Sequence, residues 1–127
     1  MIDQPPRLRA RLARVPATVI VGAQWGDEGK GKIVDLLAQE SDLVCRYQGG
    51  PNAGHTIVVA GETYKIRQIP TGIIAAKRCA IGAGCVVDPG VLVAELDELE
   101  TRGHETAGLL FVSGNAHLIM PWHVALD

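Results

Sequence analysis

The stretch GAQWGDEGKGKI, residues 22–33, decides how this chain is expected to fold. It follows the apolar, β-branched run ATVIV at 17–21, which has the character of a buried strand. Apolar residues then recur at helical spacing, so a helix is predicted over 33–40. A strand, a glycine-rich turn and a helix in this order aim free backbone N–H groups at an anion. Residues 26–32 fit G-x-x-x-x-G-K, the phosphate-loop pattern, in the context that this pattern requires.

The last position of the pattern differs from the usual one. Ser or Thr normally follows the lysine and holds Mg²⁺, whereas this chain has Ile33. Hard cations take oxygen ligands, and the nearest candidate inside the loop is Asp27. A carboxylate among phosphate-binding amides is unfavourable unless a metal or a chemical step needs it. The alternative is a glycine-rich turn in which the aspartate only caps a helix.

Composition limits the classes to which the protein can belong. A chain of 127 residues with 47% hydrophobic residues and 15 glycines suits one α/β domain with a substantial core. Twelve basic and fourteen acidic residues leave a net charge of −2, so no general polyanion-binding surface is indicated. Two Trp, two Tyr and one Phe are too few for an aromatic nucleic-acid face. No apolar run approaches the ~20 residues of a membrane span.

The cysteines point to a reducing compartment. Cys45, Cys79 and Cys85 form neither an even framework nor a C-x-x-C pair. We therefore predict free, partly buried thiols in a cytoplasmic protein.

Residues 1–16 differ in composition from the rest of the chain. Four arginines face a single acid, Asp3, and prolines bracket the stretch. Arginine-rich N-termini can be transit peptides or anchors on an anionic surface. This one is short and lacks serine, so a mobile basic extension is predicted, followed by one α/β domain over 17–127.

Local patterns predict the elements that follow the first helix. Because a helix separates the first two strands, these strands should be parallel and joined by a right-handed crossover. Alternating half-buried residues around Ala60-Gly61-Glu62 indicate a β-hairpin. The predicted elements are strand 43–48, hairpin strands 56–59 and 63–67, strand 78–81, helix 89–102, strand 109–112, strand 118–120 and a helix that begins at Pro121.

The helix over 89–102 has the clearest signals. Asp88 and Pro89 suit its N-cap and first position, and Gly103 suits its end. Leucines 92, 96 and 99 line one face. Its acidic residues are predicted to lie off that face, in solvent; they are Glu95, Asp97, Glu98 and Glu100.

A second glycine-rich segment, GGPNAGHT at 49–56, follows strand 43–48 and has the composition of a loop. Ligands of open α/β sheets bind beyond the carboxyl ends of the strands. This loop should therefore lie beside the phosphate loop. His55 is the histidine with a local reason for a chemical role, whereas His117 and His123 are too far apart for a helical metal pair.

Residues 26–32 and 49–56, in this order, resemble two long motifs of the adenylosuccinate synthetase family. The similarity continues through IPTGI at 69–73 to WHVALD at 122–127, and thus covers roughly 17–127. The family's chains are far longer, so this chain looks truncated within their N-terminal part. The fold expected from the residues and the resemblance is α/β, like the phosphate-loop NTPases, with a mostly parallel sheet and a β-hairpin insertion.

The resemblance implies a chemical role for three residues. The activity is GTP-dependent ligation of aspartate to inosine monophosphate (IMP) through 6-phosphoryl-IMP, in AMP biosynthesis. Asp27 would remove the N1 proton of the purine and bind Mg²⁺, the carbonyl of Gly54 would be a second Mg²⁺ ligand, and His55 would be a proton donor to the transferred phosphate. A sister activity on 2-aminopurine nucleotides lacks this aspartate. Full-length members are homodimers, and neither nucleic acid nor a membrane is an expected partner.

The resemblance also implies which residues bind substrate. GTP would contact 26–32 and 54–56, with Lys32 in the phosphate-loop lysine position, and IMP would contact 27–30 and 52–55. The alternative is a nucleotide-binding switch or partner module without ligase activity, which Ile33 disfavours. The full predicted binding set is Gly26, Asp27, Glu28, Gly29, Lys30, Gly31, Lys32, Asn52, Ala53, Gly54, His55 and Thr56.

Overall fold

The structure, a computed structural model, describes residues 17–22 and 30–127. Residue contacts divide the chain into two units, Met1–Lys30 and Gly31–Asp127. The predicted mobile extension at 1–16 and most of the predicted phosphate loop, at 23–29, lie outside the described residues.

Residues 17–22 form neither helix nor strand, so the prediction of a buried strand at 17–21 is wrong for this structure. Val19 is 71% exposed and Val21 is 67% exposed. A β-branched run favours extended backbone, but a strand exists only when a neighbouring strand accepts its hydrogen bonds. No ladder among the described residues includes this segment.

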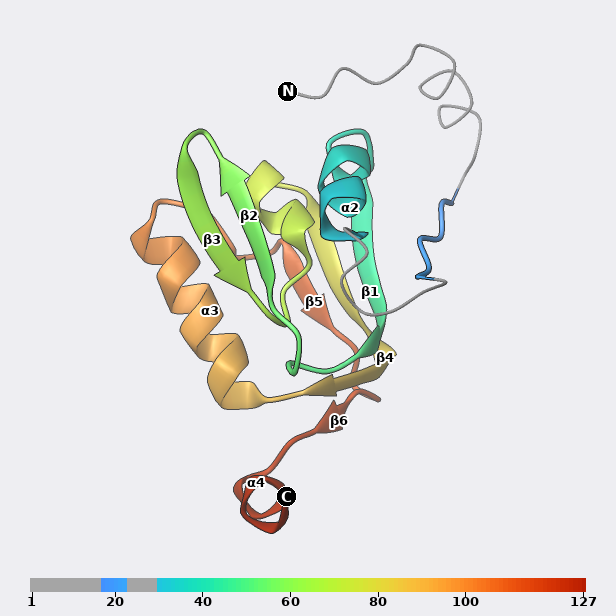
Figure 1. Ribbon diagram of the computed structural model, residues 1–127, viewed down its shortest axis with the longest axis vertical. Coiled ribbons are helices and arrows are strands. Elements are labelled where there is room, and N and C mark those ends of the chain that lie inside the picture. Colours follow the sequence, from blue (N-terminus) through green and yellow to red (C-terminus); the bar gives the residue numbers. More distant parts are fainter. Residues whose placement is uncertain (1–16, 23–29) are drawn as a thin grey trace. The chain divides into compact units, whose positions relative to one another are not determined.

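The rest of the described chain contains both helices and strands (Figure 1). The first helix begins three residues earlier than predicted. The elements are α2 (Lys30–Ala38), β1 (Leu43–Gly49), β2 (His55–Val59), β3 (Glu62–Ile66), the 3-10 helix η1 (Thr71–Ala75), β4 (Arg78–Val87), α3 (Pro89–Thr101), β5 (Leu110–Val112), β6 (His117–Leu118) and α4 (Pro121–Leu126).

One parallel sheet organises Gly31–Asp127, with β4 at its centre (Figure 1). β4 pairs in parallel with β1, with β5 and, near its end, with β6. β2 and β3 form a separate antiparallel hairpin in which Ile57 faces Tyr64. The predicted fold class, a mostly parallel α/β sheet with a hairpin insertion, is confirmed.

β4 is longer than predicted, because it runs through Gly82 and Gly84 to Val87 instead of ending at residue 81. The register of its pairing with β1 shifts between Arg46 and Gln48, which brings the backbone of β1 close to both glycines. A Cβ added at position 84 would lie 2.5 Å from the Tyr47 carbonyl oxygen. The glycines thus permit close strand pairing here rather than a turn.

The main hydrophobic core lies between the hairpin, the sheet and α3. Its buried members come from β2, β3, the segment around η1, β4 and α3; they are Ile57, Tyr64, Ile66, Ile69, Ile73, Cys79 and Leu99. Gly72 makes this packing possible, since a Cβ there would lie 2.5 Å from Val44 Cγ2. All three cysteines are free, as predicted, with Cys79 and Cys85 buried. None of the helices within residues 30–127 is long and apolar enough to cross a membrane.

α3 forms as its local signals predict, with one exception. The Asp88 carboxylate accepts hydrogen bonds from the Gly90 and Val91 N–H groups, at 2.9 and 3.2 Å. Gly103, with φ +87°, follows the helix. The prediction that Glu95 faces solvent is wrong, because only 7% of this residue is exposed. Position 95 lies three residues after one leucine of the buried face and four before another, so it shares that face.

Candidate functional site

Several loops meet at one edge of the parallel sheet. β1 ends at Gly49, β4 at Val87 and β6 at Leu118, and parallel strands place their carboxyl ends at the same edge. A cavity of about 420 Å³ lies at this edge. Its lining includes Pro51 and Asn52 after β1, Arg67 after β3, Val86 and Asp88 at the end of β4, and Ile119 after β6.

Asn52 and Arg67 are the two polar side chains that give the cavity its chemical character. A third polar residue, Asp88, has another role. The Asp88 carboxylate is engaged in capping α3. Asn52 and Arg67 are exposed, and no hydrogen bond joins either side chain to another of the described residues. A guanidinium and an amide beside apolar walls suit a ligand with an anionic group and a polar ring.

The two glycine-rich motifs come together at His55. This half-buried histidine opens β2 and pairs with Ile66 of β3. Gly31 lies in the first turn of α2, and a Cβ added there would be 3.3 Å from His55 Nδ1. The imidazole therefore packs against the start of the helix, where backbone N–H groups lack intrahelical partners and attract anions.

The structure describes only part of the predicted binding set. Gly26, Asp27, Glu28 and Gly29 lie outside the described residues. Lys30, Gly31 and Lys32 form the first turn of α2, with Lys32 exposed. Asn52, Ala53 and Gly54 lie in the exposed loop after β1, and Thr56 is exposed on β2. Among the described residues no three side chains of His, Cys, Asp or Glu gather as metal ligands, and the roles of Asp27 and Gly54 in metal binding stay predictions.

Sequence reasoning missed Arg46, Arg67 and Glu95, although a signal existed for two of them. Arg46 is two residues from the core-facing Val44, so both side chains project from the same face of β1. Glu95 has helical spacing to the buried leucines. Burying a charged side chain on a core face costs free energy unless the charge is paired, so such a residue usually has a specific partner. Arg67 gave no local signal, because only the fold brings it to the same cavity as Asn52.

A parallel α/β sheet with a phosphate-loop sequence and a cavity at its carboxyl edge is typical of nucleotide-binding proteins. The sequence profile of adenylosuccinate synthetases matches residues 19–127, and the chain belongs to this family. The resemblance noted from the two motifs is thereby confirmed.

Individual relatives agree with this assignment. The adenylosuccinate synthetase of Sorangium cellulosum is 62% identical over 112 residues, which is 87% of this chain and 26% of that one. The fully ligated adenylosuccinate synthetase of Plasmodium falciparum has a TM-score of 0.71 and 39% identity, covering 84% of this chain and 24% of its own. The succinoaminodeoxyadenylate synthetase of cyanophage S-2L, bound to dGMP and dATP, has a TM-score of 0.62 and 28% identity, covering 81% of this chain and 29% of its own. The chain thus spans about a quarter of the length of the curated relatives it matches.

Proposed function

We propose that this chain supplies the N-terminal part of an adenylosuccinate synthetase, which ligates aspartate to IMP at the expense of GTP. The observation that carries the proposal is the packing of His55 against Gly31 at the start of α2. A histidine beside a helix N-terminus can act on a phosphoryl group that the helix binds. Family membership supplies the identity of the reaction.

The reaction would proceed in two steps. The γ-phosphoryl group of GTP would bond to O6 of IMP with release of GDP, while Asp27 would take the N1 proton of the purine. The amine of aspartate then forms a bond to C6 and displaces inorganic phosphate, which gives adenylosuccinate. His55 would serve as proton donor to the transferred phosphoryl group, and N–H groups of residues 26–32 with Lys32 would hold the phosphates of GTP.

The residues of this chain fit a Mg²⁺ ion through oxygen donors. Mg²⁺ binds proteins through one or two oxygen ligands together with substrate phosphates, and the Asp27 carboxylate and the Gly54 carbonyl are such donors. The ion would neutralise charge on the phosphoryl group during transfer. As the motifs imply, GTP would contact residues 26–32 and 54–56, and IMP would contact residues 27–30 and 52–55.

IMP would occupy the cavity at the carboxyl edge of the sheet, where Asn52 and Arg67 lie. The phage relative, bound to dGMP, raises a 2-aminopurine nucleotide as the competing substrate. We favour IMP because this chain has Asp27 as a base for the purine N1 proton. A nucleotide-binding switch without ligase activity is the other candidate, and such a switch would ignore IMP.

A chimera tests the proposal. Residues 17–127 would replace the matching segment of the Sorangium cellulosum enzyme, which is 62% identical. We expect adenylosuccinate formation that requires IMP, GTP and aspartate and that dGMP does not support. Asp27→Asn should lower kcat by about 10²–10⁴, and His55→Ala should lower kcat more than it weakens nucleotide binding. A folded chimera that hydrolyses GTP without any dependence on IMP would favour the switch instead.

The 127-residue chain alone should form no adenylosuccinate. Phe111 of β5 is 52% exposed and Val112 is 43% exposed, and because neighbouring strand residues project to opposite faces, neither face of this strand is fully covered by the described residues. Catalysis of phosphoryl transfer depends on placement within ~1 Å, which an incompletely covered sheet holds poorly. We further propose that the complete enzyme is a cytoplasmic homodimer. Assay of the isolated chain beside the chimera tests the expected inactivity. Mass measurement of the chimera tests the homodimer.

A further inference from the structure

Arg46 joins two separate segments at the cavity. It projects from β1 and is half-buried. Its guanidinium donates to the Gly50 carbonyl oxygen at 2.7 Å, to the Gln68 carbonyl oxygen at 3.3 Å and to the Arg67 carbonyl oxygen. Gly50 belongs to the loop that carries Asn52, Arg67 belongs to the segment after β3, and both segments line the cavity. One side chain thus connects these two segments.

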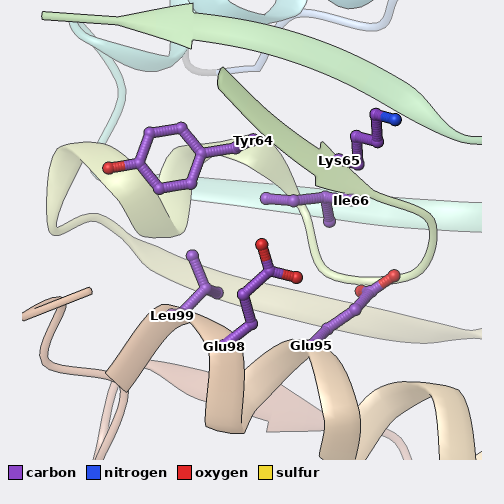
Figure 2. Close-up of a pocket in the computed structure, with 6 residues that line it drawn as sticks. All are labelled: Tyr64, Lys65, Ile66, Glu95, Glu98 and Leu99. Atoms are coloured by element: carbon purple, nitrogen blue, oxygen red, sulfur yellow. The ribbon is translucent and has the colours of Figure 1, made fainter. Parts of the chain in front are cut away.

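Glu95 holds the second of these segments from the other side. Its Oε1 accepts from the Arg67 N–H at 2.5 Å, and its Oε2 accepts from the Gln68 and Ile69 N–H groups, each at 3.1 Å. Figure 2 shows the Glu95 side chain rising from α3 towards the loop that follows β3. The carboxylate spans three successive N–H groups, and those of Gln68 and Ile69 would otherwise be buried without partners.

The short segment after β3 is therefore fixed on both sides, with its carbonyl groups on Arg46 and its N–H groups on Glu95. The side chain of Gln68 adds a further tie, because it donates to the Asp88 carbonyl oxygen and accepts from the Asp88 N–H, both at 2.8 Å. These charge-assisted hydrogen bonds form one continuous network from α3 through this segment to the Asn52 loop.

The geometry points to Arg46 and Glu95 as positioning residues that together set the distance between the Asn52 loop and Arg67. This inference deepens the proposed function, since the walls they hold are those of the proposed IMP cavity. If the Glu95 carboxylate only stabilised the core, the segment that it holds would not also need the Arg46 guanidinium, which donates to the Gly50 carbonyl oxygen as well. If the two residues act as a unit, disturbing either one should loosen both walls.

Two near-isosteric substitutions break the unit, and each has a matched control. Glu95→Gln replaces one acceptor oxygen by an NH₂ donor that faces backbone N–H groups. Asp97→Asn removes the same charge from the exposed side of α3. Arg46→Lys keeps the charge but loses the planar fork that reaches several carbonyl groups. Arg78→Lys makes the same change at an exposed position of β4.

Amide hydrogen exchange of the chain, followed by mass spectrometry, measures the loosening without any substrate. We expect both Glu95→Gln and Arg46→Lys to speed exchange in peptides 49–56 and 67–70 by about tenfold or more, as loss of a charge-assisted hydrogen bond implies. Peptides within β4 and both control variants should match the wild-type chain. Faster exchange at 67–70 alone after Glu95→Gln, or no change in either segment, would overturn the inference.

A global loss of protection in Glu95→Gln would show that this variant is unfolded, and Arg46→Lys would then decide. The Arg46→Lys variant must then show faster exchange in peptide 49–56 while exchange within β4 stays as in the wild-type chain. Otherwise the inference fails. In the active chimera, both substitutions should reduce kcat/KM for IMP by about tenfold while the controls do not. Unchanged kcat/KM would refute the positioning role even where exchange is faster. Exchange needs no reaction, so its outcome is independent of the proposed activity.

Discussion

Gly84→Ala should destabilise the chain, because β1 and β4 pair too closely at this point to admit a methyl group. The added Cβ would lie 2.5 Å from the Tyr47 carbonyl oxygen, which is backbone and cannot rotate away. To reach a tolerable contact of about 3.0 Å the two strands must separate by roughly 0.5 Å. Overpacking of this kind costs ~1–3 kcal/mol, and strain on a ladder hydrogen bond adds ~0.5–1.5. Alanine also lowers the conformational entropy of the unfolded chain, which offsets only ~0.4–1 kcal/mol of this cost.

The expected loss is therefore about 2 kcal/mol, or roughly a 30-fold change in the folding equilibrium. Urea unfolding followed by circular dichroism measures it. Gly82→Ala is a graded comparison, since its Cβ would lie 3.3 Å from the Arg46 carbonyl oxygen. Gly114→Ala is the neutral control, because nothing lies within 4 Å of its added Cβ. Stability of Gly84→Ala equal to that of Gly114→Ala would refute the close pairing of β1 with β4.

Three further predictions concern the core and α3. Gly72→Ala should cost about 1–3 kcal/mol in urea unfolding, because its Cβ would meet Val44 Cγ2 at 2.5 Å; shortening Val44 to Ala should restore most of the loss. Burial raises the pKa of the Cys79 thiol to about 12 from an ordinary value of 9.0, so above pH 9 the unfolded chain loses a proton that the folded chain keeps. Stability should therefore fall with pH between these values, and the fall should be shallower in Cys79→Ala. Asp88→Ala removes the cap of α3 and should cost about 1 kcal/mol, seen as a lower urea midpoint with an unchanged slope.

Elements with local signals could be predicted from the sequence. The Asp88-Pro89 start of α3 and the glycine after its end each act within a few residues of the element they mark. The hairpin likewise follows from alternation around a tight turn, and Ile57 and Tyr64 face each other as that alternation requires. Such features depend on φ preferences and neighbouring hydrogen bonds, which are properties of the segment itself.

Features that depend on distant partners could not be predicted in this way. Whether 17–21 becomes a strand depends on a neighbouring strand, and Gly84 resembles a turn residue until the backbone of β1 is known to lie beside it. For Glu95 the helical spacing indicates the buried face of α3, but the sequence does not indicate the partner that makes its burial possible. An acid on a helix is normally solvated, and only the loop after β3 supplies the three N–H groups that hold it inside. The motifs indicated His55 and Asn52, but Arg67 enters the cavity through the fold alone.

Gly31→Ala separates stability from function at the contact on which the proposed function rests. Position 31 lies in the first turn of α2, where alanine has a higher helix propensity than glycine, so the variant should be at least as stable as the wild type. Its Cβ would lie 3.3 Å from His55 Nδ1, and the imidazole must yield by a few tenths of an ångström. Since a displacement of ~1 Å costs about 10²-fold in rate, kcat of the chimera should fall about fourfold to tenfold. A shifted His55 ring resonance in NMR spectra should accompany that fall. Full activity together with the shifted resonance would show that the ring's position does not govern catalysis, and His55 would lose its proposed role as proton donor.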